Sequence, residues 1–205
     1  RTGSYNVMLG DSSGMALVSG GSNVFIGPFI GGSNLATTTN SVLLGVSAAA
    51  GTSNYEAQRL TIMGARAGQS MATGADNNIL IGYQAADSLT TGANNLIIGY
   101  DIEAPSNTAD NQLNIGNIIF GTGVDGAGTT LSSGNIGIGT TSPSSKLDVW
   151  GDFRVGTSGS PLMLADTAAN QVIFDRGAFD KPSIIFDNDD DTGFYSEEPG
   201  RVDIV

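Results

Sequence analysis

One short phrase recurs seven times between residues 6 and 116: an opening residue, usually polar, three mostly apolar residues and a glycine. Successive closing glycines are 17, 18, 19, 18, 17 and 17 residues apart. A unit this short cannot bury its own apolar side chains, so it must stack on its neighbours. The period therefore predicts an all-β parallel β-solenoid, or β-roll, with coils of about 18 residues over residues 1–117. The phrases are Asn6–Gly10, Asn23–Gly27, Ser41–Gly45, Leu60–Gly64, Asn78–Gly82, Asn95–Gly99 and Gln112–Gly116.

Both faces of the predicted strands are apolar. Side chains alternate between the two faces of a strand, so Ile79 and Ile81 face one way and Leu80 the other. One face can fill the coil, and the other leaves an apolar stripe that a soluble monomer rarely exposes. We predict that the middle residues of the phrases form this stripe and contact symmetry-related copies of the chain around an axis: Met8, Phe25, Leu43, Ile62, Leu80 and Ile97. The middle residue of the seventh phrase is Asn114, so the roll should end near residue 116.

The corners of the coils are rich in glycine and asparagine, which supply the positive φ angles of tight turns. Four of the phrases open with asparagine: Asn6, Asn23, Asn78 and Asn95. We expect these side chains to stack as a ladder whose amides bond one coil to the next.

The remainder of the chain has a different sequence pattern. Residues 118–141 are glycine-rich and break the period, which suggests a neck. Residues 142–205 form short apolar runs between Gly, Asp, Pro and Ser turns, which predicts a β-rich shaft or knob region. The runs are 146–149, 152–155, 161–164, 171–174, 183–186 and 201–205. The last run stops inside a strand pattern and the first residue is Arg1, so both ends look cut from a longer polypeptide.

Composition excludes several classes of function. The formal charge of −12 disfavours nucleic acid and anionic membranes as partners, since both attract cationic surfaces. No run of 18 apolar residues is present, so no membrane insertion is expected in this segment. Cysteine and histidine are both absent. Disulfides, Ser–His and Cys–His nucleophiles and histidine-ligated zinc are therefore unavailable.

The coil phrases resemble the β-roll heads of trimeric autotransporter adhesins and related repeats of phage tail fibres. The stretch Asn135–Val149 is similar to a segment of tail fibres that often precedes a self-cleaving intramolecular chaperone, and Ser183–Tyr195 resembles a further phrase of the same fibres. The resemblance implies a left-handed roll and a homotrimer with interleaved chains, on a virion or cell surface and used for attachment. Phage tail fibre and cell-surface adhesin both stay open.

Two patterns suggest bound ligands. Asp187, Asp189 and Asp191 have the 1, 3, 5 spacing of a calcium loop, and Glu198 falls at position 12. Position 6 is Thr192 where such a loop needs glycine, so a solvated acidic turn is the stronger interpretation. Gly121–Gly126 matches a dinucleotide-binding pattern, but no helix is expected after it to receive a pyrophosphate. We therefore expect no cofactor other than a possible calcium ion.

Only a carboxylate pair, as in glycoside hydrolysis, could support catalysis here. The acidic residues of the roll show no spacing that forces such a pair: Asp11, Glu56, Asp76, Asp87, Asp101, Glu103 and Asp110. A tailspike-type polysaccharide depolymerase is thus the alternative, and a non-enzymatic attachment fibre is the expectation. Tyr83 and Tyr100 each follow a repeat glycine and should stack on adjacent coils. Their rings could contact a surface glycan or protein receptor, although packing of a corner is the plainer role.

Overall fold

The computed structural model describes residues 3–32, 35–157, 160–166, 171–174, 184–186, 189–195 and 203–204, with side chains for 3–32 and 35–153. Every regular element in these ranges is a β-strand, and none of the described residues is helical. The chain divides into two compact units, residues 1–148 and 149–205.

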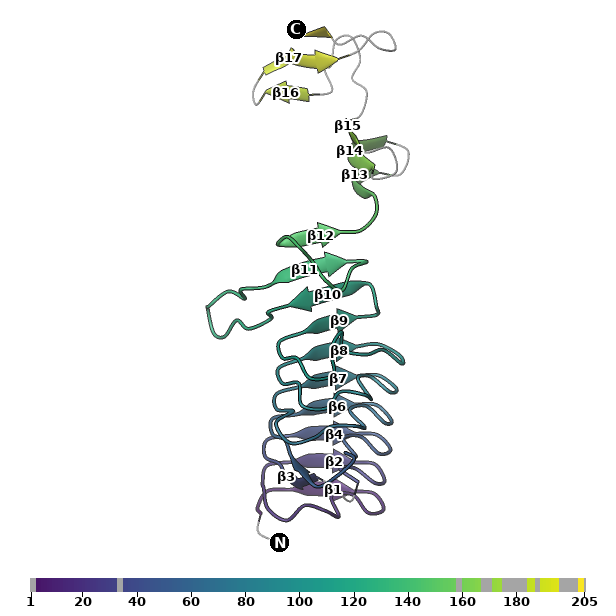
Figure 1. Ribbon diagram of the computed structural model, residues 1–205, viewed down its shortest axis with the longest axis vertical. Helices are drawn as coiled ribbons and strands as arrows, with labels where there is room; N and C mark the ends of the chain where they lie inside the picture. Colours follow the sequence, from purple (N-terminus) through teal and green to yellow (C-terminus); the bar gives the residue numbers. More distant parts are fainter. Residues whose placement is uncertain are drawn as a thin grey trace. The chain divides into compact units, whose positions relative to one another are not determined.

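Seven short strands form the stacked part of the first unit. Figure 1 shows them one above another along the coil. Each pairs in parallel with the next, with partners 17 to 19 residues apart, as in Val7 with Val24 and Val42 with Thr61. The result is the predicted parallel β-solenoid of about six turns, with coils of about 17 residues. Its strands are β1 (Val7–Leu9), β2 (Val24–Ile26), β4 (Val42–Leu44), β6 (Thr61–Met63), β7 (Ile79–Ile81), β8 (Leu96–Ile98) and β9 (Leu113–Ile115). A two-stranded sheet of β3 (Leu35–Thr37) and β5 (Tyr55–Glu56) lies within the wider coils.

The glycine that closes each phrase makes the first corner of the coil. Gly82 has a φ of 133°, and a Cβ at this position would lie 1.9 Å from the carbonyl oxygen of Gly99 in the next coil. A side chain is therefore excluded both by the backbone conformation and by the close stacking of the corners. The same close contact relates Gly10 to Gly27, Gly45 to Gly64 and Gly64 to Gly82.

The predicted asparagine ladder is confirmed. The Oδ1 atom of Asn78 accepts the backbone N–H of Asn95 at 2.8 Å, and Asn95 Oδ1 in turn accepts the N–H of Gln112 at 2.9 Å. The Nδ2 atom of Asn78 donates to carbonyls of its own coil and the next, so the buried amide is satisfied. Leu60 interrupts the ladder, because its side chain offers no acceptor to the following coil.

The middle residue of each strand points into the coil, and this corrects the sequence interpretation. Phe25, Leu43, Ile62, Leu80 and Ile97 are all 0% exposed and form the core of a single chain. They are therefore not available to contact other copies, and their predicted role as a trimer interface is wrong. Met8 occupies the same column but is 37% exposed, because it belongs to the first of the coils that the structure describes. The narrow coil has room for one large side chain per strand, and the opposite wall supplies Leu35, Tyr55, Met71 and Leu89.

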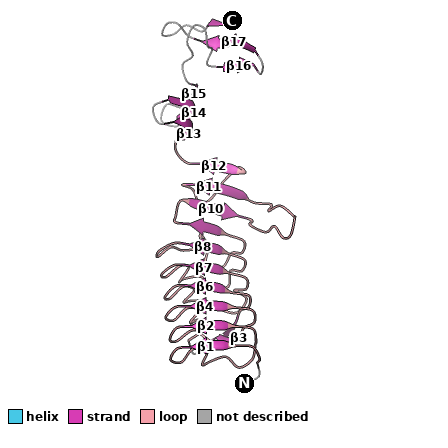
Figure 2. Ribbon diagram, turned by 180° about the vertical axis from the view of Figure 1, so that it is seen from behind, coloured by secondary structure: helices cyan, strands magenta, loops and turns pink. Residues whose placement is uncertain are grey.

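The sheet continues past the last parallel strand. β10 (Ile119–Thr122) reverses direction and pairs antiparallel with β9, and β11 (Asn135–Ile138) pairs antiparallel with β10. β12 (Leu147–Val149) completes a ten-stranded sheet. The segment predicted as a neck thus contains two strands joined by a loop that projects sideways from the sheet (Figure 2). The dinucleotide-like phrase runs from β10 into this loop, where the Asp125 carboxylate accepts hydrogen bonds from the N–H and hydroxyl of Ser133.

The second unit contains two antiparallel three-stranded sheets. One is formed by β13 (Phe153–Thr157), β14 (Ser160–Asp166) and β15 (Gln171–Phe174). The other is formed by β16 (Ile184–Phe186), β17 (Asp189–Tyr195) and β18 (Asp203–Ile204). The six apolar runs each contain or overlap a strand, whereas β17 coincides with the acidic stretch that was expected to be a turn.

Candidate functional surfaces

The outward face of the solenoid sheet is a continuous apolar surface. The first and third residues of each parallel strand point away from the coil, and none of the fourteen is buried. Val42 is 38% exposed and Met63 41%, even in the middle of the stack. The set carries no charge, and Thr61 is its only polar member: Val7, Leu9, Val24, Ile26, Val42, Leu44, Thr61, Met63, Ile79, Ile81, Leu96, Ile98, Leu113 and Ile115. We call it the outer face.

The outer face extends onto the antiparallel strands. Ile119 lies opposite Ile115 on one side and Ile138 on the other, so the three isoleucines form a row across β9, β10 and β11. Nine strands about 4.8 Å apart, most of them with two outward residues, cover about 400 Å². The largest apolar patch on a typical soluble monomer is about 300–600 Å², and patches of this size are often sites of interaction. This face therefore has the character of an interface.

Tyr83 and Tyr100 stack as expected. Their ring centroids lie 5.5 Å apart with an interplanar angle of 19°. They are 41% and 75% exposed, at the corner where β7 and β8 end. The equivalent position of earlier coils holds Asp11, Pro28, Val46 or Ala65, so the aromatic pair is confined to the last two coils before β9.

A pair of carboxyl groups, which sequence spacing did not reveal, lies in the turns that follow Tyr83 and Tyr100 along the chain. Asp87 hydrogen-bonds with Glu103 of the next coil, and Gln84 Nε2 donates to Asp87 Oδ2 at 2.8 Å. The backbone N–H of Ser88 donates to Glu103 Oε2 at 3.3 Å. Burial first, and then the hydrogen bond that the protonated Glu103 carboxyl group donates to the Asp87 carboxylate, raise the pKa of Glu103 to about 7. Sequence spacing does not identify this pair, because the two residues are one position short of the 17-residue offset between their coils.

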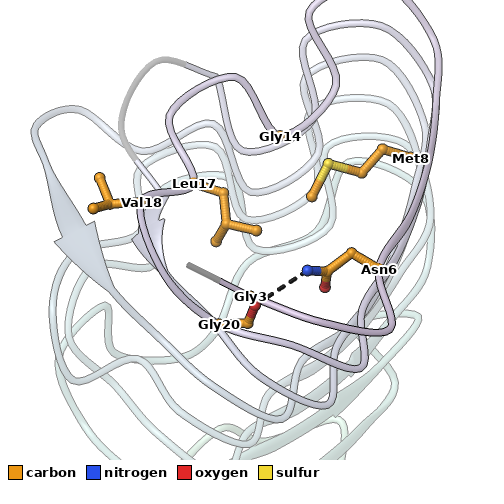
Figure 3. A pocket seen from close by; sticks show the side chains of 7 residues that line it. All are labelled: Gly3, Asn6, Met8, Gly14, Leu17, Val18 and Gly20. Carbon is orange, nitrogen blue, oxygen red and sulfur yellow. Dashed lines mark hydrogen bonds between the residues drawn. The ribbon is translucent and has the colours of Figure 1, made fainter. Parts of the chain in front are cut away.

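The two ends of the stack of parallel coils differ. At the C-terminal end, Asn114 is 1% exposed, and its Nδ2 donates to the carbonyl oxygen of Glu103 at 2.7 Å and to Asn117 Oδ1 at 2.8 Å. Phe120 of β10 follows at 7% exposure, so the core is closed there. At the N-terminal end, Met8 and Leu17 point from opposite sides into a cavity of about 180 Å³ (Figure 3).

The other predicted ligand sites are only partly within the described residues. Asp187 lies outside them, and Asp189 and Asp191 belong to β17, of whose side chains nothing is described. The calcium site therefore stays a prediction. Among the described residues, no three Asp or Glu side chains converge as a metal site, and no helix could cross a membrane.

No protein-family model, curated protein or solved structure matches the chain.

Proposed function

We propose that the chain is a structural and adhesive segment of a homotrimeric extracellular fibre, such as a phage tail fibre or a cell-surface adhesin, which mediates attachment to a host or surface receptor. The outer face carries this proposal. It is apolar, and it carries no charged residue over its seven parallel strands. Equivalent residues of neighbouring strands lie directly opposite one another, so the surface is regular. Two further copies of the chain, packed around a three-fold axis, would remove it from water on all three copies. The proposal includes left-handed winding and a fibre shaft or knob in residues 142–205.

The first test is the mass of the purified chain in solution. Light scattering should give close to three times the chain mass of 20.8 kDa. A folded monomer at micromolar concentration would contradict the trimer, because the outer face would then be stable in water. A dimer would contradict the three-fold arrangement while keeping the outer face as an interface.

For the adhesive role, we propose the stacked Tyr83 and Tyr100 rings as receptor contacts. Aromatic rings bind the apolar faces of sugars, and the two hydroxyls can hydrogen-bond. Screening the fragment on a glycan array tests this. Tyr83→Ala and Tyr100→Ala should each abolish a signal that the matched control Tyr5→Ala retains, since Tyr5 is 88% exposed in the first coil. Equal binding by all three variants would exclude the tyrosine pair.

A depolymerase is less favoured as the function. Glycosidases separate their two carboxyl groups by about 5 Å or more, to accommodate a sugar carbon or a water molecule. Asp87 and Glu103 instead hydrogen-bond with each other. A polysaccharide-cleavage assay would test this, and activity lost in Glu103→Gln would favour the enzyme.

A further inference from the structure

The ring of Tyr100 has one face that the aromatic stack leaves uncovered. Tyr83 lies against its other face, with the two ring centroids 5.5 Å apart. The equivalent position of the following coil, directly after the phrase glycine, is Asn117. The Oδ1 atom of Asn117 accepts a hydrogen bond from Asn114 Nδ2 at the end of the core, so this coil adds no third ring to the stack. Tyr100 is accordingly 75% exposed, whereas Tyr83 is 41% exposed.

The turns that carry the two tyrosines are acidic. Asp101 and Glu103 follow Tyr100 in one turn. Asp87 follows Tyr83 in the neighbouring turn and hydrogen-bonds with Glu103. The Asp101 side chain is exposed, and its backbone N–H donates to the carbonyl of Tyr83 at 2.8 Å. Since three residues span at most about 11 Å of chain, both carboxyl groups of the Tyr100 turn lie near the range of about 10 Å over which charges interact in 0.1 M salt.

The sequence places no basic side chain in these turns. Residues 67–145 contain six Asp and Glu residues and no Lys or Arg. On the N-terminal side the nearest basic residue is Arg66, which is exposed and lies two coils before Tyr100. On the C-terminal side it is Lys146, whose Nζ atom donates to carbonyl oxygens of the loop between β10 and β11. A cation at the open face of Tyr100 would therefore be attracted by the carboxylates without displacing a basic side chain of the same turns.

We propose that the receptor group bound by the tyrosine pair is a cation, namely the ammonium group of an amino sugar or of a quaternary amine. The inference rests on the proposed role of Tyr83 and Tyr100 as receptor contacts and narrows the class of ligand. The face of an aromatic ring is electron-rich and attracts a cation that lies within about 6 Å of the ring centroid. Tyr100 supplies such a face, and Asp101 supplies a negative charge in the same turn. A neutral sugar would gain nothing from this charge, and an acidic sugar would be repelled by it.

The test compares choline with its neutral isostere 3,3-dimethyl-1-butanol, in which carbon replaces the ammonium nitrogen. Each would be titrated at constant ionic strength while the NMR signals of isotope-labelled tyrosine rings are followed. Choline should bind in the millimolar range and at least about threefold more tightly than the isostere, because a cation gains a modest free energy at an exposed aromatic face. Glucosamine and glucose, compared at mildly acidic pH, repeat the test with a sugar. Whichever cation binds more tightly indicates whether an amino sugar or a quaternary amine is the better ligand.

Three variants locate the site. Tyr100→Leu keeps an apolar side chain and should remove the preference for choline over its isostere. Asp101→Asn should weaken the binding of choline about twofold, as expected for an exposed charge, and leave the isostere unaffected. Asp11→Asn is the matched control and should change neither ligand. Asp11 is exposed and directly follows the phrase glycine of the first coil, five coils or about 24 Å from Tyr100.

Affinity for choline should also increase as the pH rises through about 7, because Glu103 then loses its proton and adds a negative charge to the turn. Glu103→Gln should remove this increase. Equal binding of choline and its isostere, or no saturation by choline up to about 0.1 M, would overturn the inference. Equal binding would still leave the tyrosine pair as the contact for a neutral receptor. A glycan array without any signal would instead contradict the adhesive role, whichever of the two small ligands bound more tightly.

Discussion

Leu80 lies directly opposite Ile97 in the parallel register of β7 and β8, and neither side chain reaches solvent. Each is the single large residue that its strand contributes to the core. Leu80→Ala should therefore lower the free energy of unfolding by about 2–5 kcal/mol, since the stacked coils on both sides limit collapse into the cavity. Urea unfolding followed by circular dichroism would measure this. A loss below about 1 kcal/mol would contradict the inward position of Leu80.

The adjacent residue should behave in the opposite way. Ile79 is 39% exposed on the outer face, so Ile79→Asp should leave the coil folded and prevent trimer formation by placing an unpaired charge in an apolar interface. Light scattering and circular dichroism would be measured together. Leu131→Asp is the control, because Leu131 is 89% exposed in the loop between β10 and β11. If Ile79→Asp formed normal trimers, the outer face would not be the contact between copies.

Two glycines with positive φ should respond differently to the same substitution. Gly82→Ala should cost at least about 2 kcal/mol of folding free energy, because its Cβ would overlap the Gly99 carbonyl and φ is 133°. At Gly116, where φ is 61°, an added Cβ would meet no atom within 4 Å. There the cost should be about 1 kcal/mol, from the left-handed backbone alone. Thermal melts of the two variants would test the difference.

Glu103 should make the stability of the roll depend on pH. Its pKa rises from the ordinary value of 4.5 to about 7 in the folded chain. The folded state therefore holds a proton that the unfolded state has released, and the stabilisation is complete below about pH 4.5 and lost as the pH rises through 7. Because Glu103 is only partly buried, we expect a fall in Tm of a few degrees. Glu103→Gln should reduce this pH-dependent fall in Tm. Glu56→Gln changes an exposed residue of β5 and should leave the fall in Tm unchanged.

The sequence predicted most of the architecture because the architecture is periodic. Spacing of the glycines predicted the stacked strands, the asparagine ladder and the stacking of Tyr83 on Tyr100. It could not tell the inside of the coil from the outside, since Leu80 and its neighbours Ile79 and Ile81 are equally apolar. One weak signal was present: Thr61 is the only polar residue among the flanking positions of the six phrases before Gln112, and a hydroxyl is better tolerated toward water than in the core.

Other features of the fold and of the candidate site could not be predicted from the spacing of the coils. β17 is rich in aspartate, which disfavours strands by propensity, and its pairing with β16 overrides that tendency. The contact of Asp87 with Glu103 depends on the shape of the return loop, because the two residues are one position short of the 17-residue offset between their coils. A glycine-rich composition suggested a neck at residues 118–141, yet Ile119, Phe120, Ile136 and Ile138 provide the side chains of two strands.

The equivalence of the coils has a consequence for how such a protein can change in length. Asn77 and Asn94 occupy equivalent corners of successive coils, with φ angles of 59° and 57°. Each is followed by an asparagine of the ladder. Deleting residues 78–94 would join Asn77 to Asn95. Equivalent residues of the remaining coils would still stack on one another, and the roll would have one coil fewer. The length of the roll is thus a whole number of coils, each of which adds about 4.8 Å. Duplication or loss of a single coil in the gene would lengthen or shorten the roll by one such step, without a change to either end.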